Sequence, residues 1–271
     1  MTIRRLSRYR WRALAAAAMI ALATASCSSG GGGTPPTASA VPATAAETPA
    51  TAPPTAALAP TVGPARVVYR EDTARRTVAL TFDAGSDAGF TASILETLRR
   101  EEIRATFSVT GLWAEQNHSL LLAIAADGHE IINHTYDHAS FTGLSTGKPP
   151  LTAAERALEL SRTETTVYHL TQRSTRPYFR PPYGDIDAVV EQDAAAAGYG
   201  TIVMWTVDSL GWKGATADAI VERCLAQAAP GAIYVMHVGS ESQDAAALER
   251  VIDGLREAGY GFVTIDELLR D

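Results

Sequence analysis

The sequence predicts an α/β fold with about seven parallel strands, arranged either as a barrel or as a wound parallel sheet. Two observations predict it: short apolar runs alternate with helical stretches, and five of the runs lead into a charged or titratable residue. Because parallel strands joined by helices point their carboxyl ends the same way, these residues should gather at one mouth of the sheet. The five strand-end residues are Asp83, His134, Arg180, Asp208 and His237.

The individual elements follow from local patterns of apolar residues and caps. Runs of β-branched and apolar residues predict strands at residues 77–82, 105–109, 129–132, 178–179, 201–207, 232–236 and 262–265. Helical spacing predicts helices at residues 91–100, 119–126, 186–197, 217–226 and 245–258, and a longest helix that begins at Thr152. Glu155 stands three residues after Thr152, which is the spacing of a capping box.

The first 66 residues read as an export signal and a tether. Residues 1–27 combine five arginines, an apolar stretch and small residues before Cys27, which predicts a lipoprotein-type signal peptide with the lipid on Cys27. The alternative is an ordinary signal peptide with a chance cysteine. Residues 28–66 are mostly Gly, Pro, Thr and Ala, which predicts a disordered linker. The folded domain is then residues 67–271, exported and either lipid-anchored to the outer face of the bacterial cytoplasmic membrane or secreted.

Charge and cysteine content narrow the function of this domain. The chain has 23 Lys and Arg against 30 Asp and Glu, and five of the Arg but none of the acids lie in residues 1–27. The remaining 18 basic and 30 acidic residues give a formal charge of −12. An acidic domain repels phosphate backbones, so no nucleic acid partner is expected, and no protein partner is predicted. Cys224, the one cysteine of the domain, is interpreted as a buried apolar residue rather than a catalytic thiol.

Two imidazoles four residues apart, His134 and His138, form the strongest local signal for a metal site. They can converge from one helical turn or a tight loop onto one divalent ion. Two surface or core histidines are the alternative. A third ligand should be a carboxylate or another imidazole, because hydrolytic zinc sites usually keep three protein ligands and one open position.

The strand that ends at Asp83 continues as Asp83-Ala-Gly-Ser-Asp87. A carboxylate at this mouth can ligate a metal or take a proton from water. Helix capping is the alternative for Asp87, because a helix begins near Gly89.

Three further features accompany these residues. The prolines of Arg180-Pro-Pro-Tyr-Gly184 make a rigid loop that can hold the Arg180 guanidinium against a carboxylate, or a purely structural turn. His237 follows a strongly apolar strand and is either a site residue or a core histidine. Trp205 and Trp212 flank Asp208, and such rings either bind sugar faces or belong to the core.

Five motifs in a fixed order carry a resemblance to a known family. They are Thr81-Phe-Asp83, His134-Thr-x-x-His138, Arg180-Pro-Pro-Tyr-Gly184, Asp208-x-x-x-Trp212 and a strand ending in His237. Together they resemble the polysaccharide deacetylases of the NodB-homology type, carbohydrate esterase family 4, over residues 77–269. The resemblance implies a distorted (β/α) barrel of about seven parallel strands and one divalent metal ion, zinc or else cobalt. It also implies hydrolytic removal of N-acetyl groups from amino sugars of peptidoglycan, chitin or related glycans.

The resemblance also implies a role for each residue. His134 and His138 would hold the metal, and Asp83 would be the general base that activates water. Arg180 would orient Asp83, and His237 would be the general acid that protonates the leaving amine. The backbone N–H of Tyr183 would help to stabilise the oxyanion.

Two positions depart from the family pattern. The family has a second Asp after the base as third metal ligand, where this chain has Ala84; Asp87 is the candidate substitute. The family also has an Asp before the Trp that supports the acid His, where this chain has Gly211. Asp208 is the candidate support, and otherwise His237 would titrate near its ordinary pKa of about 6.5.

The expected function is therefore that of a metal-dependent N-deacetylase acting on an acetylated glycan, with substrate choice in loops such as residues 141–150. Ala84 and Gly211 also permit a non-catalytic glycan-binding protein on the same fold. An esterase that removes O-acetyl groups, for example from xylan, would use the same metal chemistry.

Overall fold

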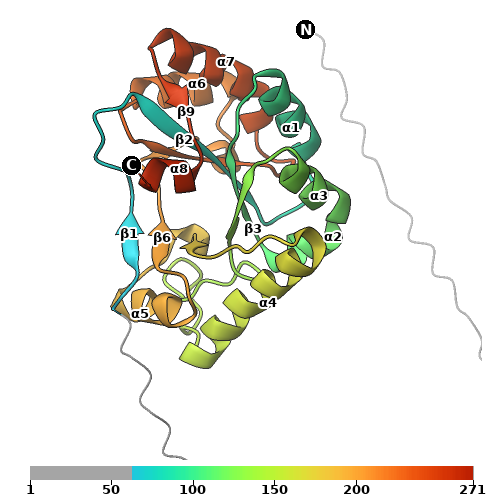
Figure 1. Ribbon diagram of the computed structural model, residues 1–271, viewed down its shortest axis with the longest axis vertical. Helices are drawn as coiled ribbons and strands as arrows, with labels where there is room; N and C mark the ends of the chain where they lie inside the picture. Colours follow the sequence, from blue (N-terminus) through green and yellow to red (C-terminus); the bar gives the residue numbers. More distant parts are fainter. Residues whose placement is uncertain (1–62, 271) are drawn as a thin grey trace, which may run out of the picture. The chain divides into compact units, whose positions relative to one another are not determined.

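The computed structural model describes residues 63–270 (Figure 1). The predicted signal peptide, Cys27 and most of the predicted linker lie outside these residues. Strand β1 (Arg66–Val68) starts at the end of the predicted linker, where Ala65 is already buried. No helix within residues 63–270 is long and apolar enough to cross a membrane.

The described residues form a curled parallel sheet, a half-barrel, with helices packed around it (Figure 1). The other strands are β2 (Thr77–Ala84), β3 (Thr106–Val109), β4 (Glu130–Asn133), β5 (Tyr178–Phe179), β6 (Thr201–Val203), β7 (Val207–Asp208), β8 (Ile233–His237) and β9 (Gly261–Phe262). Their order is β1-β6-β5-β4-β3-β2-β8-β7, with β9 beside β2, and every ladder between them is parallel. The predicted α/β fold is confirmed.

The helices lie largely where the apolar spacing predicts them. They are α1 (Thr91–Arg100), α2 (Gly111–Gln116), α3 (His118–Ala126), α4 (Ala153–Thr171), α5 (Ala188–Ala196), α6 (Ala217–Ala226), α7 (Asp244–Glu257) and α8 (Ile265–Leu269). Helix α4 starts with the predicted capping box of Thr152 and Glu155. Helix α1 buries Ile94, Leu95 and Leu98 on its predicted face. The sequence missed the short helices α2 and α8, since one or two turns carry too little periodicity.

The expected single strand at residues 201–207 is wrong in one respect, because the run contains two strands. Strand β6 pairs with β1 and β5, whereas β7 pairs with β8 at the other end of the sheet. Between them, Met204 N–H donates to the Val68 carbonyl (2.7 Å) and Thr206 N–H to the Ile233 carbonyl (3.1 Å). The run therefore crosses the open side of the half-barrel, which a β-rich composition cannot reveal.

The core is apolar and closely packed around the central strands. Phe82 of β2 stacks on Phe107 of β3 with ring centroids 5.2 Å apart. Cys224 is a free, fully buried thiol, and burial raises its pKa to about 12, which confirms the apolar interpretation.

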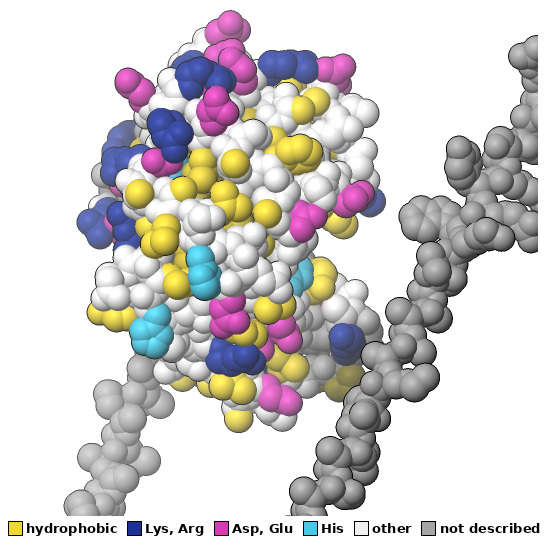
Figure 2. All heavy atoms as spheres, turned by 90° about the vertical axis from the view of Figure 1, so that its right-hand side faces the viewer, with side chains coloured by type: hydrophobic (Ala, Val, Ile, Leu, Met, Phe, Trp, Pro, Cys, Tyr) yellow, Lys and Arg dark blue, Asp and Glu magenta, His cyan; other side chains and the backbone are white. Residues whose placement is uncertain are grey.

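The surface shown in Figure 2 carries α1 to α4. Acidic and basic side chains are interspersed on it, so this face has no large patch of positive or negative charge alone.

Candidate active site

The carboxyl ends of the parallel strands bring the predicted side chains to one mouth. Asp83 of β2 stands directly beside His237 of β8 in the parallel register. His134 follows β4, and Arg180 follows β5. A cavity of about 720 Å³ opens there, and its lining includes Asp83, Asp87, His134, His138, Tyr183, Asp208 and His237.

Asp83 is held by a buried arginine. Arg180 is fully buried, and its Nη1 donates to Asp83 Oδ1 (2.7 Å) and to Thr81 Oγ1 (2.7 Å). Its Nε donates to the Val203 carbonyl (3.1 Å), so the fork is fixed from several sides. Burial alone would raise the pKa of Asp83, but Arg180 and the nearby imidazoles hold that pKa below its ordinary value. Asp83 is therefore an ionised carboxylate positioned to accept a proton or bind a cation.

The two histidines of the pentapeptide converge from a tight loop, not from a helix. Thr135 and His138 both have positive φ angles near 65°, and the rings of His134 and His138 lie 4.9 Å apart. His134 Nδ1 lies 2.8 Å from the Arg180 carbonyl, which fixes Nδ1 as the donor and leaves Nε2 with a free lone pair. Burial lowers the pKa of His134 and lowers that of His138 to about 4. Both rings are thus neutral near pH 7, as metal ligands must be.

The predicted third ligand, Asp87, lies in the same cavity but is bound to another group. Its carboxylate accepts the Ser240 N–H (2.9 Å) and the Ser240 hydroxyl (2.5 Å). The alternative of Asp87 as a helix cap is wrong, because α1 is preceded by Phe90 and has no side-chain cap. Among residues 63–270, no three His, Cys, Asp or Glu side chains are grouped as a metal site. Of the three predicted metal ligands, the imidazoles of His134 and His138 lie together, whereas Asp87 is bound to Ser240.

Aromatic side chains form the rim of the cavity. Tyr183 and Trp212 are each about half exposed, so the core interpretation of Trp212 is wrong, while Trp205 is partly buried against the core. Tyr183 has a φ of 63° and lies edge-on to His138, with ring centroids 4.8 Å apart. Exposed rings at the rim of a cavity suit the apolar faces of sugars.

A loop that the sequence associates with substrate choice is tied to this rim. Ser145 lines the cavity, and its hydroxyl and N–H donate to the carboxylate of Asp185 (2.6 and 3.0 Å). Ser140 also donates to Asp185, which is nearly fully buried. Asp185 directly follows Gly184, so it fixes the loop to the Arg180–Gly184 segment. Asp185 could not be recognised from the sequence, because its partner Ser145 lies 40 residues away and no local pattern marks the contact.

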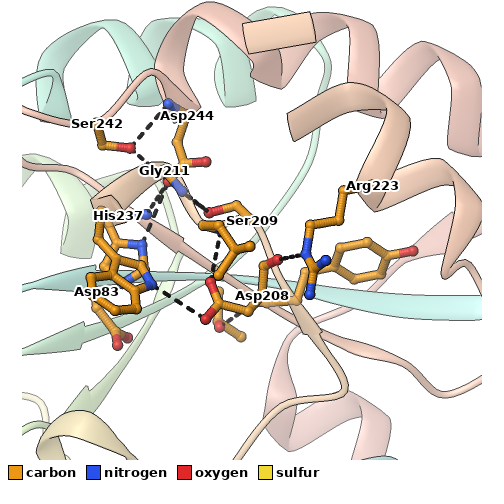
Figure 3. A network of polar contacts seen from close by, with 12 residues as sticks. Asp83, Asp208, Ser209, Gly211, Arg223, His237, Ser242 and Asp244 are labelled. Carbon is orange, nitrogen blue, oxygen red and sulfur yellow. Dashed lines mark hydrogen bonds and ion pairs between the residues drawn. The ribbon is translucent and has the colours of Figure 1, made fainter. Parts of the chain in front are cut away.

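The surroundings of His237 differ from the sequence expectation. The Asp208 carboxylate accepts the Leu210 N–H (2.8 Å) and Trp212 Nε1–H (3.3 Å) within its own loop. Asp244, from the first turn of α7, lies against His237 instead, with Oδ2 at 3.6 Å from Nδ1 (Figure 3). Burial lowers the pKa of His237, but the carboxylates of Asp244, Asp83 and Asp208 outweigh burial and raise that pKa above 6.5. His237 therefore does not titrate as an unsupported histidine.

An ionised carboxylate, two neutral imidazoles and a histidine of raised pKa share one cavity, and such a set of groups is suited to hydrolysis. Residues 70–202 match the polysaccharide deacetylase family. The peptidoglycan-N-acetylmuramic acid deacetylase PdaA of Bacillus subtilis is 32% identical over 204 residues, which cover 74% of each chain. The peptidoglycan-N-acetylglucosamine deacetylase PgdA of Listeria monocytogenes is 34% identical over 195 residues, 70% of this chain and 38% of the relative. This chain belongs to the polysaccharide deacetylase family.

Solved structures agree in fold. The structure of PdaA from Bacillus subtilis, a family 4 carbohydrate esterase, has a TM-score of 0.68 at 30% identity and covers 75% of this chain and 85% of its own. A wild-type family 4 pseudoenzyme from Bacillus anthracis has a TM-score of 0.67 at 31% identity, with 75% and 68% coverage. A mutant of that pseudoenzyme has restored enzymatic activity, with a TM-score of 0.65 at 32% identity and 75% and 71% coverage. Similarity at this level therefore includes active and inactive proteins.

Proposed function

We propose that this protein is a metal-dependent hydrolase that removes N-acetyl groups from the amino sugars of peptidoglycan or a chitin-like glycan. The observation that carries the proposal is the pairing of Asp83 with buried Arg180, directly beside His237 and the two imidazoles of one cavity. The relatives named as peptidoglycan deacetylases favour peptidoglycan as the glycan.

Each of the site residues has a proposed role in amide hydrolysis. Asp83 is the general base that takes a proton from the attacking water, and Arg180 holds its carboxylate in place. His237 is the general acid that gives a proton to the leaving amine, for which a raised pKa is suitable. The N–H of Tyr183 helps to bind the oxyanion, and Asp208 fixes Trp212 at the rim.

A divalent metal, zinc or else cobalt, fits the two neutral imidazoles of His134 and His138. When bound, the metal would polarise the acetyl carbonyl as a Lewis acid and lower the pKa of the attacking water. Asp87 is the proposed third ligand, and to act as one it must release Ser240. Metal content of Asp87→Ala, measured beside Ser240→Ala, tests this. Reduced metal in Asp87→Ala and retained metal in Ser240→Ala are expected, whereas equal metal in Asp87→Ala and wild type rejects Asp87 as a ligand.

The proposed location is the outer face of the cytoplasmic membrane, through a lipid on Cys27 and the linker of residues 28–66. Cys27→Ala should then move the protein from the membrane fraction into the soluble exported fraction. An unchanged membrane fraction rejects the lipid on Cys27.

Acetate release from N-acetylated peptidoglycan and chitin oligomers tests the activity. The wild-type protein should release acetate, a chelator should stop the release, and zinc or cobalt should restore it. Asp83→Asn is expected to lower the rate by about 100- to 10,000-fold, the share of a general base. The same assay on O-acetylated xylan separates the esterase alternative. Absence of release from every substrate with either metal refutes the deacetylase.

A second candidate is a non-catalytic glycan-binding protein on the same scaffold. It is favoured by Ala84 at the expected ligand position and by the lack of a three-ligand group in the described part of the chain. It predicts glycan binding that Asp83→Asn leaves intact and no acetate release by wild type.

A further inference from the structure

We propose that Asp244, in the first turn of α7, is a positioning residue that holds the imidazole of His237 in the orientation and tautomer of a general acid. The inference rests on the proposed function for its catalytic meaning, but its geometry stands by itself. Asp244 lies in a helix outside the five sequence motifs, and no local pattern marks it as a site residue.

The first observation is how tightly this carboxylate is fixed. Asp244 is fully buried, and its Oδ2 accepts the Ser242 hydroxyl (2.8 Å) and the Ser209 hydroxyl (3.1 Å). The same oxygen accepts the backbone N–H of His237 (2.8 Å), so α7 and the end of β8 are joined through it (Figure 3). A charge buried this deeply is costly unless it is satisfied or has a cationic partner.

The second observation is a pair of polar atoms without hydrogen-bond partners. Among the described side chains, His237 Nδ1 and Asp244 Oδ1 are both buried and unpaired. Nδ1 lies 3.6 Å from Asp244 Oδ2, which is an ion-pair distance and too long for a hydrogen bond. A shift of a few tenths of an ångström would give Nδ1–H a carboxylate acceptor. Nδ1–H held in this way leaves Nε2 as the nitrogen that exchanges a proton with substrate.

The third observation concerns the space in front of Gly211. A Cβ built on Gly211 would lie 2.6 Å from Asp244 Oδ2 and would also overlap the Ser242 hydroxyl. Position 211 and the Asp244 carboxylate therefore compete for one volume. The family pattern has an Asp at the position of Gly211, and Asp208 was the candidate replacement in this chain. Because Gly211 has no side chain, the Asp244 carboxylate occupies the space that a side chain at position 211 would fill.

A purely structural role is the rival explanation, because an acidic residue in the first turn stabilises a helix. The rival predicts a change of stability only. The positioning role predicts an altered pH profile, since the Asp244 charge favours the protonated ring. Charged and titratable groups that face His237 are Asp83 from β2, Asp208 from β7, Asp244 from α7, and His134 and His138 from the loop after β4.

The test is Asp244→Asn in the full chain, which keeps the shape and an acceptor oxygen but removes the charge. Asp187→Asn is the matched control, because Asp187 caps α5 through the Val190 N–H (2.8 Å) away from His237. Acetate release is measured against pH with zinc, and the His237 ring is titrated by NMR.

Asp244→Asn should lower kcat by about 10- to 100-fold, part of what general acid catalysis supplies, with KM within about twofold. The alkaline limb should move to lower pH by about one pH unit, because the ring loses its proton more easily without the carboxylate. Asp187→Asn should leave both unchanged. An alkaline limb and a His237 titration that coincide with wild type overturn the proposal, even if Asp244→Asn unfolds more easily.

Failure of the proposed function is distinguishable from failure of this inference. If the wild type releases no acetate with zinc or cobalt, the deacetylase is refuted, and the NMR titration alone decides the pairing. A lower His237 pKa in Asp244→Asn then supports the pairing, and an unchanged pKa refutes it.

Discussion

Asp83 and His237, the two groups proposed to transfer protons, each lie beside a fully buried residue of opposite charge, but in different ways. Arg180 donates to Asp83 over 2.7 Å, with the guanidinium also bound to Thr81 and the Val203 carbonyl. Asp244 lies 3.6 Å from the His237 ring, with no hydrogen bond between the two side chains. We call Arg180 and Asp83, which share a hydrogen bond, the closed pair. We call Asp244 and His237, whose side chains share none, the open pair.

This difference suits the two roles proposed for Asp83 and His237. The proposed general base must stay ionised until it accepts a proton, and a charged hydrogen bond from Arg180 favours the ionised carboxylate. A general acid must gain and lose its proton in each turnover, and a looser pair raises its pKa without trapping the proton. Asp83 and His237 are adjacent in the sheet, but their partners come from different elements, since Arg180 follows β5 and Asp244 lies in α7.

Breaking the closed pair should have the largest effect. Arg180→Met leaves the Asp83 charge buried without its partner, which should lower the free energy of unfolding by about 3 to 5 kcal/mol. Arg180→Lys keeps the charge but not the fork, and should recover part of this stability and little activity. Urea unfolding and acetate release measure both. Equal free energies of unfolding for Arg180→Met and wild type would show that Arg180 does not stabilise the buried Asp83 carboxylate.

Filling the space beside the open pair should have a smaller effect. Gly211→Ala places a methyl group against the Asp244 carboxylate and the Ser242 hydroxyl, which should cost about 1 to 3 kcal/mol of folding free energy through overpacking. Adding Asp244→Ala should relieve that cost, so the double variant should be more stable than the sum of the single changes predicts. Additive effects in thermal or urea unfolding would mean that the two positions do not compete.

The smallest expected effect is a pH-dependent contribution of His237 to stability. Its raised pKa means that the folded state binds the proton more tightly than the unfolded state does. This contribution is fully present below the unfolded pKa of about 6.5 and is lost as pH rises through the raised folded pKa. The stability difference between wild type and His237→Asn should therefore be larger at pH 6 than at pH 9, by less than about 1 kcal/mol. A difference that grows with pH would reverse the sign of the pairing.

The strand-end residues were predictable because each directly follows a recognisable apolar run. The alternation of strands and helices fixed the sheet as parallel, and parallel strands share one mouth. His134 and His138 were visible from their spacing, although they lie in a loop that turns through positive φ angles at Thr135 and His138 and not in a helix. Tyr183 and Trp212 were visible as aromatic residues near strand ends, and only the fold showed that they are exposed.

The partners of those residues were much less predictable. Asp87 is near Asp83 in the chain, yet its carboxylate binds Ser240, 153 residues away. Asp208 is near Trp212 in the chain and binds it, which leaves the support of His237 to Asp244. The crossing at residues 204–206 was hidden for the same reason, since a β-rich run does not reveal which edge of the sheet it joins.

The sequence by itself determined the α/β fold, the mouth of the sheet and the side chains that reach it, because these follow from periodicity and from the direction of strands. The tertiary structure decided which buried charge lies beside His237, and it buried the expected pair of Arg180 and Asp83. Contacts such as those of Arg180 with Asp83 and Asp244 with His237 depend on where helices and loops pack in three dimensions. Burial then decides their strength, because a charge removed from water interacts far more strongly with its neighbours than the same charge on the surface.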